Sequence, residues 1–422
     1  MGRHARAMRI ITRLFAALLA AGLQACVTQP VAAPQAARTV PVEAREPVVI
    51  LVSIDGFRAD YLKRGVTPNL GALAAAGISA AMRPSFPSIT FPNHYTLVTG
   101  LRPDRNGIVG NRMEDPAHPG QVFTMQSEQP FWWGEAEPIW VTAEKAGIRT
   151  ATQFWPGSNV DLGGVRPHDW AQFAGAISDR QRVDGVVDWL RRPTDNRPRF
   201  VTLYFDLIDH AGHEFGPDSA ETTAALAKLD GEIGRLRDAL AGLGQPVNWV
   251  IVADHGMAPT SPDRVIKLYE RIDPSLYRTI TAGPYAGLEP QPGKEAALAA
   301  ALAAPVPHMA CWPKAAIPPA LHYGANPRVP SFVCLAQAGW LIADKPPEPG
   351  RIFKPGGAHG YDPAAPEMAA LFIASGPGIK PLGAIAAFDN VDVAPLLRAL
   401  LGLPQDPRLD GTDAPFRAAL GR

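Results

Sequence analysis

Three nearly continuous apolar runs dominate the hydrophobic pattern of the chain. They cover residues 47–54, 199–205 and 247–253 and are rich in β-branched and aromatic side chains. A run without regular polar alternation is typical of a strand that is buried on both faces, as in a parallel sheet. Asp55 and Asp254 stand at the ends of the first and third runs. Because ligands of open α/β sheets bind beyond the carboxyl ends of the strands, we expect a site there.

Helical patterns separate these runs. The expected helices are 67–77, 139–146, 179–191, 218–243, 293–304 and 389–400. The first has a proline, Pro68, at its start and Gly77 as its expected stop. Alternating strands and helices predict an α/β fold with a mostly parallel sheet and helices on both faces. Between residues 259 and 351 the alternation weakens and prolines accumulate, which predicts a smaller inserted α+β subdomain beside the site.

Candidate metal ligands gather after the predicted strands and in Gly-rich loops. A single aspartate after a strand is often only a turn former or a helix cap, so the full set carries the signal. Carboxylate oxygens mixed with imidazole nitrogens suit zinc or a similar divalent ion, and three protein ligands per ion leave room for a substrate. The set indicates a two-metal hydrolase. Its members are Asp55, Asp209, His213, Asp254, His255 and His359.

A candidate nucleophile, Thr90, lies between the first two groups of ligands. The segment around it predicts a short helix that ends at Gly100, with Thr90 in the first turn. A threonine hydroxyl is a poor nucleophile by itself, but a metal ion and the positive end of a helix both favour its alkoxide. The alternative is that Thr90 is a plain N-cap.

Seven short motifs resemble those of the nucleotide pyrophosphatase/phosphodiesterase branch of the alkaline phosphatase superfamily, in a bacterial form with a single catalytic domain. They are SIDGFR at 53–58, FPSITFPNH at 86–94, GIVGN at 107–111, WPGS at 155–158, DHAGHEFGP at 209–217, ADHGM at 253–257 and GAHGY at 357–361. The resemblance implies an alkaline-phosphatase-like fold and two Zn²⁺ ions. One ion would be held by Asp209, His213 and His359, and the other by Asp55, Asp254 and His255 with Thr90 beside it.

The resemblance also implies hydrolysis of nucleotide phosphodiester or pyrophosphate bonds to nucleoside monophosphates, through an intermediate on Thr90. Asn111 would donate to a phosphate oxygen, and as an uncharged amide it favours a diester; otherwise it only forms a turn. Phe91 and Tyr204 are similar to aromatics that sandwich a nucleobase or line the leaving-group pocket in this family; the alternative is that they are core residues. The alternatives are a phosphomonoesterase or phosphonate hydrolase of the same superfamily, a choline or lysophospholipid phosphodiesterase, and a non-catalytic binding lipoprotein.

The N-terminal residues predict export. Residues 1–26 combine arginines with an apolar stretch too short to span a bilayer, as in a signal peptide. Cys26 follows a lipobox-like sequence, so the protein is expected in the periplasm, or on the membrane as a lipoprotein, of a Gram-negative-type bacterium; ordinary cleavage is the alternative. Residues 27–46 are rich in Ala, Pro and Val and predict a flexible tether, which leaves 47–422 as the catalytic domain.

Composition narrows the partners. The chain has 422 residues, of which 46% are hydrophobic, so it can bury the core of one large domain. A formal net charge of zero argues against bulk nucleic acid as a partner, whereas a small nucleotide needs no basic groove. Cys311 and Cys334 are sufficient for one disulfide in an oxidising compartment; the alternative is two unlinked thiols.

Overall fold

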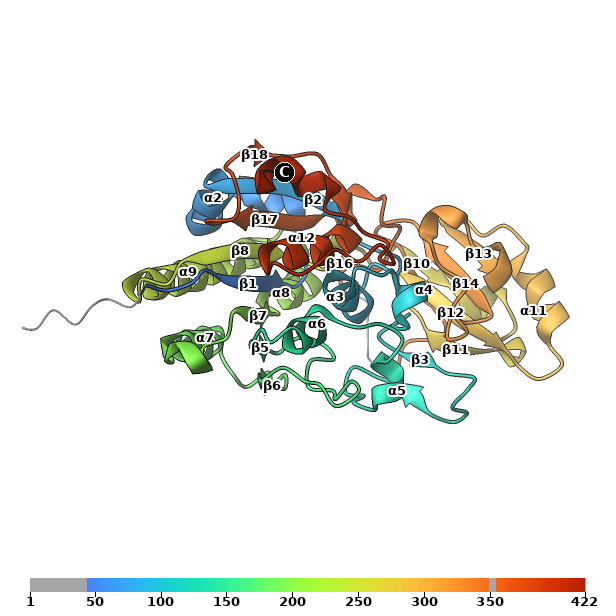
Figure 1. Ribbon diagram of the computed structural model, residues 1–422. Coiled ribbons are helices and arrows are strands. Elements are labelled where there is room, and N and C mark those ends of the chain that lie inside the picture. The colour runs from blue at the N-terminus through green and yellow to red at the C-terminus, as the bar shows by residue number, and fades with distance from the viewer. Residues whose placement is uncertain (1–43, 349–353, 422) are drawn as a thin grey trace, which may run out of the picture. The chain divides into compact units, whose positions relative to one another are not determined.

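The computed structural model describes residues 44–348 and 354–421. The expected export segment, Cys26 and all but the last three residues of the expected tether lie outside the described residues. In the described part, the molecule is built on one large central sheet, with a smaller sheet formed within residues 277–336 (Figure 1).

The central sheet has nine strands in the described residues. Eight follow the order β18 (Gly383–Ala384), β2 (Gly77–Arg83), β17 (Ala370–Ser375), β8 (Val247–Val252), β1 (Val48–Ile54), β7 (Phe200–Phe205), β5 (Thr150–Gln153) and β6 (Asp169–Ala171), and β19 (Phe388–Asp389) also pairs with β2. Strands β8, β1, β7, β5 and β6 run parallel, whereas β17 is antiparallel to both of its neighbours. The predicted α/β fold with a mostly parallel sheet is confirmed.

The three apolar runs form the adjacent central strands β8, β1 and β7. Every residue of these strands is buried, which explains the absence of polar alternation. Ile54 pairs with Phe205 and Ser53 with Val252, so the three strands end at nearly the same level. The residues that follow them therefore meet at one edge of the sheet.

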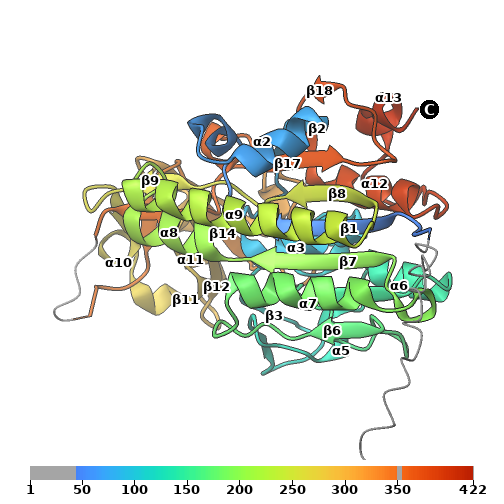
Figure 2. The ribbon, with the colours of Figure 1, turned by 90° about the vertical axis from the view of Figure 1, so that its left-hand side faces the viewer.

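Helices cover both faces of the sheet. Figure 2 shows α2 (Pro68–Ala75), α7 (Asp179–Arg191), α8 (Leu207–Phe215) and α9 (Ala220–Gly242) on the near face. The other face carries α3 (Thr90–Thr99), α6 (Ile139–Lys145) and α12 (Val393–Leu400) (Figure 1). Short helices are α4 (Pro103–Asn106), α5 (Pro130–Trp133), α10 (Leu268–Arg271) and α13 (Arg417–Leu420). Among the described residues, no helix combines the length and apolarity needed to cross a membrane.

Two residues predicted at the boundaries of helices lie in strands instead. Helix α2 ends at Ala75, and Gly77 is the first residue of β2 instead of a helix stop. A Cβ atom on Gly77 would lie 2.0 Å from the carbonyl oxygen of Ala374 on the paired strand, so close strand packing requires this glycine. Asp389 belongs to strand β19, and α12 begins only at Val393.

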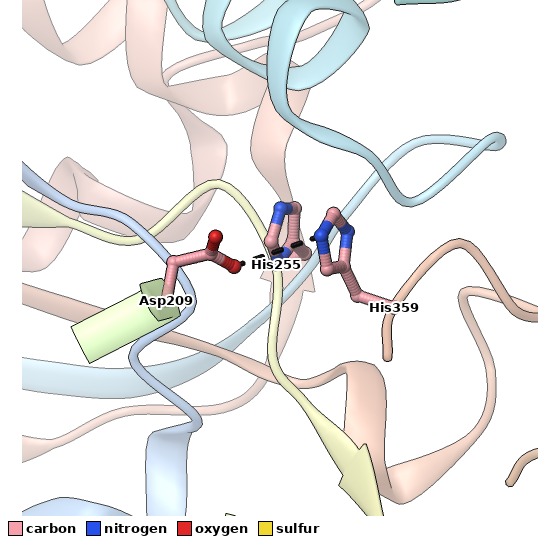
Figure 3. A group of neighbouring side chains, drawn as sticks. All are labelled: Asp209, His255 and His359. Carbon is pink, nitrogen blue, oxygen red and sulfur yellow. Dashed lines mark ion pairs between the residues drawn. The ribbon is translucent and has the colours of Figure 1, made fainter. Parts of the chain in front are cut away.

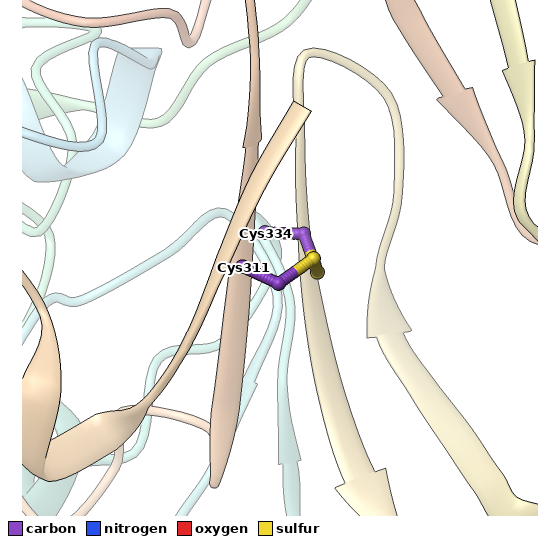
Figure 4. The surroundings of a disulfide bond; sticks show 2 residues. All are labelled: Cys311 and Cys334. Carbon is purple, nitrogen blue, oxygen red and sulfur yellow. A yellow bond between two sulfur atoms is a disulfide. The ribbon is translucent and has the colours of Figure 1, made fainter. Parts of the chain in front are cut away.

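The segment between β8 and β16 (Gly356–Ala358) forms a separate sheet with its own hydrophobic core. Its strands are β11 (Tyr277–Thr281), β12 (Tyr285–Pro290), β14 (Phe332–Ala336) and β13 (Met309–Pro313), with α11 (Glu295–Leu302) beside them. Cys311 and Cys334 face each other on the antiparallel pair of β13 and β14 and form a disulfide (Figure 4). Two-stranded sheets pair β3 (Met113–Glu114) with β4 (Val122–Phe123), β9 (Ala258–Thr260) with β16, and β10 (Val265–Lys267) with β15 (Leu341–Ala343).

Candidate metal centre and active site

The fold brings all six predicted ligands together at the carboxyl edge of the central strands. Asp55 follows β1, and Asp254 with His255 follows β8. Asp209 and His213 lie four residues apart on α8, so both project from one face of that helix. The antiparallel pair of β16 with β9 carries the sixth ligand, His359, back to the strand that follows His255.

The first group of ligands is fully buried. Nε2 of His255 lies 2.9 Å from Oδ2 of Asp254 and 3.4 Å from Oδ1 of Asp55. These three side chains could hold a metal ion. Gly56 has a φ of 67°, and a Cβ atom there would lie 3.0 Å from Asp209. A glycine after Asp55 therefore lets α8 approach the end of β1.

The second group combines Asp209, His213 and His359. Nε2 of His359 lies 3.0 Å from Nε2 of His213 and 3.6 Å from Oδ1 of Asp209. Figure 3 shows the carboxylate of Asp209 directed at the rings of His255 and His359, which stack with their centroids 3.5 Å apart. Asp209 and His359 also form, with His255, a group that could hold an ion, while the side chain of His213 is 42% exposed at the rim.

The orientation of the histidines fits a cation. Nδ1 of His213 lies 2.8 Å from the carbonyl oxygen of Gly357, and Nδ1 of His359 lies 3.1 Å from that of Ser88. A carbonyl only accepts, so each Nδ1 carries a hydrogen and each Nε2 of a neutral ring presents a lone pair. The two Nε2 atoms therefore face each other as acceptors. A shared cation resolves this arrangement, and such backbone contacts typically orient metal-binding histidines.

The carboxylates fit a cation as well. Three buried oxygens have no hydrogen-bond partner among the described residues: Oδ1 of Asp55, Oδ1 of Asp209 and Oδ2 of Asp254. Buried acceptors without donors are costly unless a cation compensates them. The oxygen-and-nitrogen donor set thus forms two adjoining groups that suit divalent metal ions.

Burial and neighbouring charges pull the pKa values of these groups apart. Burial raises the pKa of Asp55, and the nearby Asp254 and Asp209 raise it further. Burial opposes ionisation of Asp254 too, but the nearby His255 and His94 outweigh it and lower the pKa of this carboxyl. Burial, followed by His255, holds the pKa of His359 well below its ordinary value. His359 is therefore neutral at pH 7, as a metal ligand must be.

Thr90 faces the metal groups from the start of α3. It is the first residue of that helix, and Ile89 is the N-cap, so the alternative that Thr90 is a plain N-cap is wrong. Its Oγ1 lies 3.5 Å from Nε2 of His255. One turn later, the buried His94 directs Nδ1 at the Thr90 carbonyl, 2.9 Å away, and Nε2 at Oγ of Ser53. His94 thus anchors the start of the helix on β1.

Asn111 stands beside the nucleophile candidate. Its Oδ1 accepts a hydrogen bond of 2.9 Å from the backbone N–H of Phe91, which fixes the orientation of the amide. The Nδ2 group has no acceptor among the described residues, and Asn111 lines the cleft with Thr90. It is therefore free to donate to an oxygen of a bound molecule.

Comparison with known proteins identifies the family. The sequence model of the type I phosphodiesterase / nucleotide pyrophosphatase family matches residues 49–362. The chain belongs to this family. The predicted family and enzyme class are therefore confirmed.

Relatives of this nucleotide pyrophosphatase/phosphodiesterase span most of its length. An uncharacterized pyrophosphatase/phosphodiesterase of Schizosaccharomyces pombe is 38% identical over 376 residues, which cover 85% of this chain and 78% of the relative. A bis(5'-adenosyl)-triphosphatase of Xenopus laevis is 37% identical over 371 residues, covering 87% of this chain and 80% of the relative. Murine ectonucleotide pyrophosphatase/phosphodiesterase 5, solved as an inactive variant with AMP, matches with a TM-score of 0.84 and 32% identity over 89% of this chain and 100% of the murine chain.

Tyr204 of the phosphodiesterase has a contact that its sequence position does not reveal. Its hydroxyl donates to Oδ2 of Asp55 over 2.7 Å, and the residue is only 9% exposed. Its ring packs against His94 and Phe173, with centroids 5.3 and 5.9 Å away. A buried tyrosine in an apolar strand usually has a hydrogen-bond partner for its hydroxyl. The presence of Tyr204 in such a strand was the only feature of the sequence that pointed to a contact of this kind.

The metal-binding side chains lie in a cleft of about 750 Å³, whose lining residues were not all predicted from the sequence. Thr90, Phe91 and Asn111 line the cleft near the metal groups. Phe173, in the segment that follows β6, lines it as well. Phe173 is 50% exposed, which is unusual for a large aromatic side chain. No sequence motif surrounds Phe173, so its place in the cleft could not be predicted from local patterns.

Proposed function

We propose that this protein hydrolyses nucleotide phosphodiester or pyrophosphate bonds to nucleoside monophosphates, with Thr90 as the nucleophile. The proposal rests above all on one observation: the Thr90 hydroxyl lies 3.5 Å from His255, beside two groups of side chains that could hold metal ions. The murine relative was solved as an inactive variant in which alanine replaces a threonine, which supports a threonine in this role.

The metal groups would hold two zinc ions. Asp209, His213 and His359 would bind one, and Asp55, Asp254 and His255 the other, because mixed oxygen and imidazole donors with three protein ligands per ion suit zinc. When bound, the ions would favour the Thr90 alkoxide and offset the charge that develops on the attacking and leaving oxygens.

The residues of the chain supply attack and orientation. Oγ1 of Thr90 forms a bond to the phosphorus while the bond to the leaving group breaks, which leaves the nucleotidyl group on Thr90. Water then cleaves that ester, releases the nucleoside monophosphate and restores the hydroxyl. The N-terminal end of α3 favours negative charge at Thr90. The Nδ2 group of Asn111 donates to a phosphate oxygen without adding a positive charge, which suits the single charge of a diester.

The cleft supports a nucleotide as substrate. The murine relative was solved with AMP, and the Xenopus relative is named for a dinucleoside triphosphate. Phe91 lines the cleft beside Thr90, and a base stacked on an aromatic ring gains on the order of 1–3 kcal/mol. Tyr204 is buried and its hydroxyl is hydrogen-bonded to Asp55, so we propose that it positions Asp55 as a metal ligand. We propose that Phe173, instead of Tyr204, supplies the second aromatic wall for the base.

We further propose that the protein is exported. The disulfide between Cys311 and Cys334 suits an oxidising compartment. The signal peptide, the periplasmic location and attachment to the membrane through a lipidated Cys26 remain predictions about residues outside the described part.

The test compares a nitrophenyl ester of thymidine monophosphate with nitrophenyl phosphate, using the zinc-loaded protein. We expect the diester to be strongly preferred. Thr90→Ala should lower its turnover by about 10³-fold or more while the metal content stays near two ions per chain. Thr99→Ala at the other end of α3 is the matched control, because its hydroxyl donates only to the Tyr95 carbonyl in the same helix. Unchanged turnover in Thr90→Ala removes Thr90 from the mechanism, and preference for the monoester makes the protein a phosphomonoesterase.

A further inference from the structure

Two segments that carry aromatic walls of the cleft meet at a polar cluster. On one side, Phe91 packs against Trp133 with ring centroids 6.1 Å apart, and Nε1 of Trp133 donates to the carbonyl of Ser127. Glu128 follows Ser127 in the chain. On the other side, Gln172 directly precedes Phe173. Glu128 and Gln172 are therefore in a position to connect the side of the cleft that carries Phe91 with the side that carries Phe173.

The carboxylate of Glu128 connects the two sides of the cleft by hydrogen bonds. Oε1 of Glu128 accepts a hydrogen bond from Nε2 of Gln172 and another, 2.8 Å long, from Nδ2 of Asn159. The three side chains come from separate segments, around α5, after β5 and after β6, and all three line the cleft. Glu128, Asn159 and Gln172 together form what we name the polar end wall.

The polar end wall is rich in hydrogen-bond acceptors. Because both amides turn an NH₂ group toward Glu128, their carbonyl oxygens are directed elsewhere. These two oxygens and Oε2 of Glu128 receive no hydrogen bond from any described residue. The carboxylate also carries a negative charge at the cleft. A molecule that reaches this wall is therefore bound best if its edge presents hydrogen-bond donors.

We propose that the polar end wall reads the edge of the nucleobase and favours bases with amino groups. This inference rests on the proposed nucleotide phosphodiesterase activity. A base between the walls of Phe91 and Phe173 would direct its edge at Glu128. Guanine presents an N–H and an amino group side by side, which match a carboxylate, while adenine and cytosine present one amino group each. Uracil and thymine present two carbonyl oxygens around one N–H, and those oxygens would face other acceptors.

The experiment measures kcat/KM for nitrophenyl esters of GMP, AMP, CMP and UMP, each divided by that for bis(nitrophenyl) phosphate, which has no base. We expect the GMP ester to exceed the UMP ester by about tenfold or more, with AMP and CMP between them. Glu128→Gln keeps the size of the side chain but replaces an acceptor by a donor. It should reduce the ratio of GMP to UMP to about twofold or less.

The matched control is Glu270→Gln. Glu270 is an exposed glutamate on α10 that pairs with Lys267, and its substitution should leave all ratios unchanged. Equal kcat/KM for all four bases in the wild-type protein, with bis(nitrophenyl) phosphate still hydrolysed, overturns the base-reading role and leaves the proposed function intact. If Glu128→Gln loses the same fraction on the base-free diester as on the GMP ester, its role is structural and the proposal is wrong. Absence of turnover for every diester overturns the proposed function and this inference together.

Discussion

Removing the Tyr204 hydroxyl should weaken metal binding while leaving the protein folded. In Tyr204→Phe, the buried Asp55 loses the donor that lies 2.7 Å from its Oδ2. Its other oxygen, Oδ1, has no protein donor in the described part of the chain, so it cannot compensate. The ligand would then be less firmly oriented toward the metal, although the ring that fills the core is retained.

The structure sets the size of the effect. A hydrogen bond to a charged group contributes about 1.5–3 kcal/mol, and loss of a partner that orients a metal ligand lowers affinity by about 10–100-fold; the two ranges agree. The pKa of Asp55 determines how the loss of metal affinity depends on pH. Burial and the neighbours Asp254 and Asp209 raise the pKa of Asp55, whereas the Tyr204 hydrogen bond lowers it. Without that bond the pKa rises further, so protons compete better with the metal and the loss of affinity grows as the pH falls.

The assay is a competition titration of zinc against a chelator at neutral and mildly acidic pH, together with urea unfolding of the metal-free protein. The matched control is Tyr323→Phe, which removes a buried hydroxyl that donates over 2.7 Å to the carbonyl of Val109 instead of a carboxylate. The control should lose stability by about 1 kcal/mol with its zinc affinity unchanged. The reasoning is refuted if Tyr204→Phe binds zinc as tightly as the wild type at both pH values.

Two further predictions concern the stacking of the nucleobase on Phe91 and the pH dependence of thermal stability. Phe91→Ala should lower kcat/KM for nucleotide esters by about 5–150-fold, the range for one lost base stack, but lower it less for a small nitrophenyl diester; equal losses on both would assign Phe91 to core packing alone. Because the pKa values of Asp55 and Asp209 are raised in the folded state, the contribution of these two carboxyls to the stability of the metal-free protein grows as the pH falls through them. Metal binding requires the ionised forms, so calorimetry should find that the difference in Tm between loaded and chelated protein shrinks with acidification; a constant or growing difference contradicts this.

Much of the scaffold was readable from local patterns. Unbroken apolar runs predicted the strands β1, β7 and β8, because a strand covered on both faces has no solvent side on which polar residues are favourable. The same runs located the edge where Asp55 and Asp254 stand. The failed stop at Gly77 shows the limit of such patterns. That glycine is required by the carbonyl of Ala374 nearly 300 positions later, and no local signal reports such a contact.

The residue types of the site were likewise determined by the sequence, but their contacts were not. Asp209 and His213 share a helix face by their spacing alone. His359 reaches them only because β16 pairs with β9, and the hydroxyl of Tyr204 meets Asp55 only because β1 and β7 are neighbours in register.

The polar end wall, formed by Glu128, Asn159 and Gln172, was decided by tertiary structure alone. Its residues have no motif and no periodic spacing, and they become a unit only where three separate segments converge on the cleft. The sequence by itself determined the family of this chain and the kinds of donor atom that its site offers, since strand burial, helix periodicity and ligand type act over a few neighbouring residues. The partners of each side chain, and hence the selectivity we infer, depend on distances between segments far apart in the chain, which only the folded structure determines.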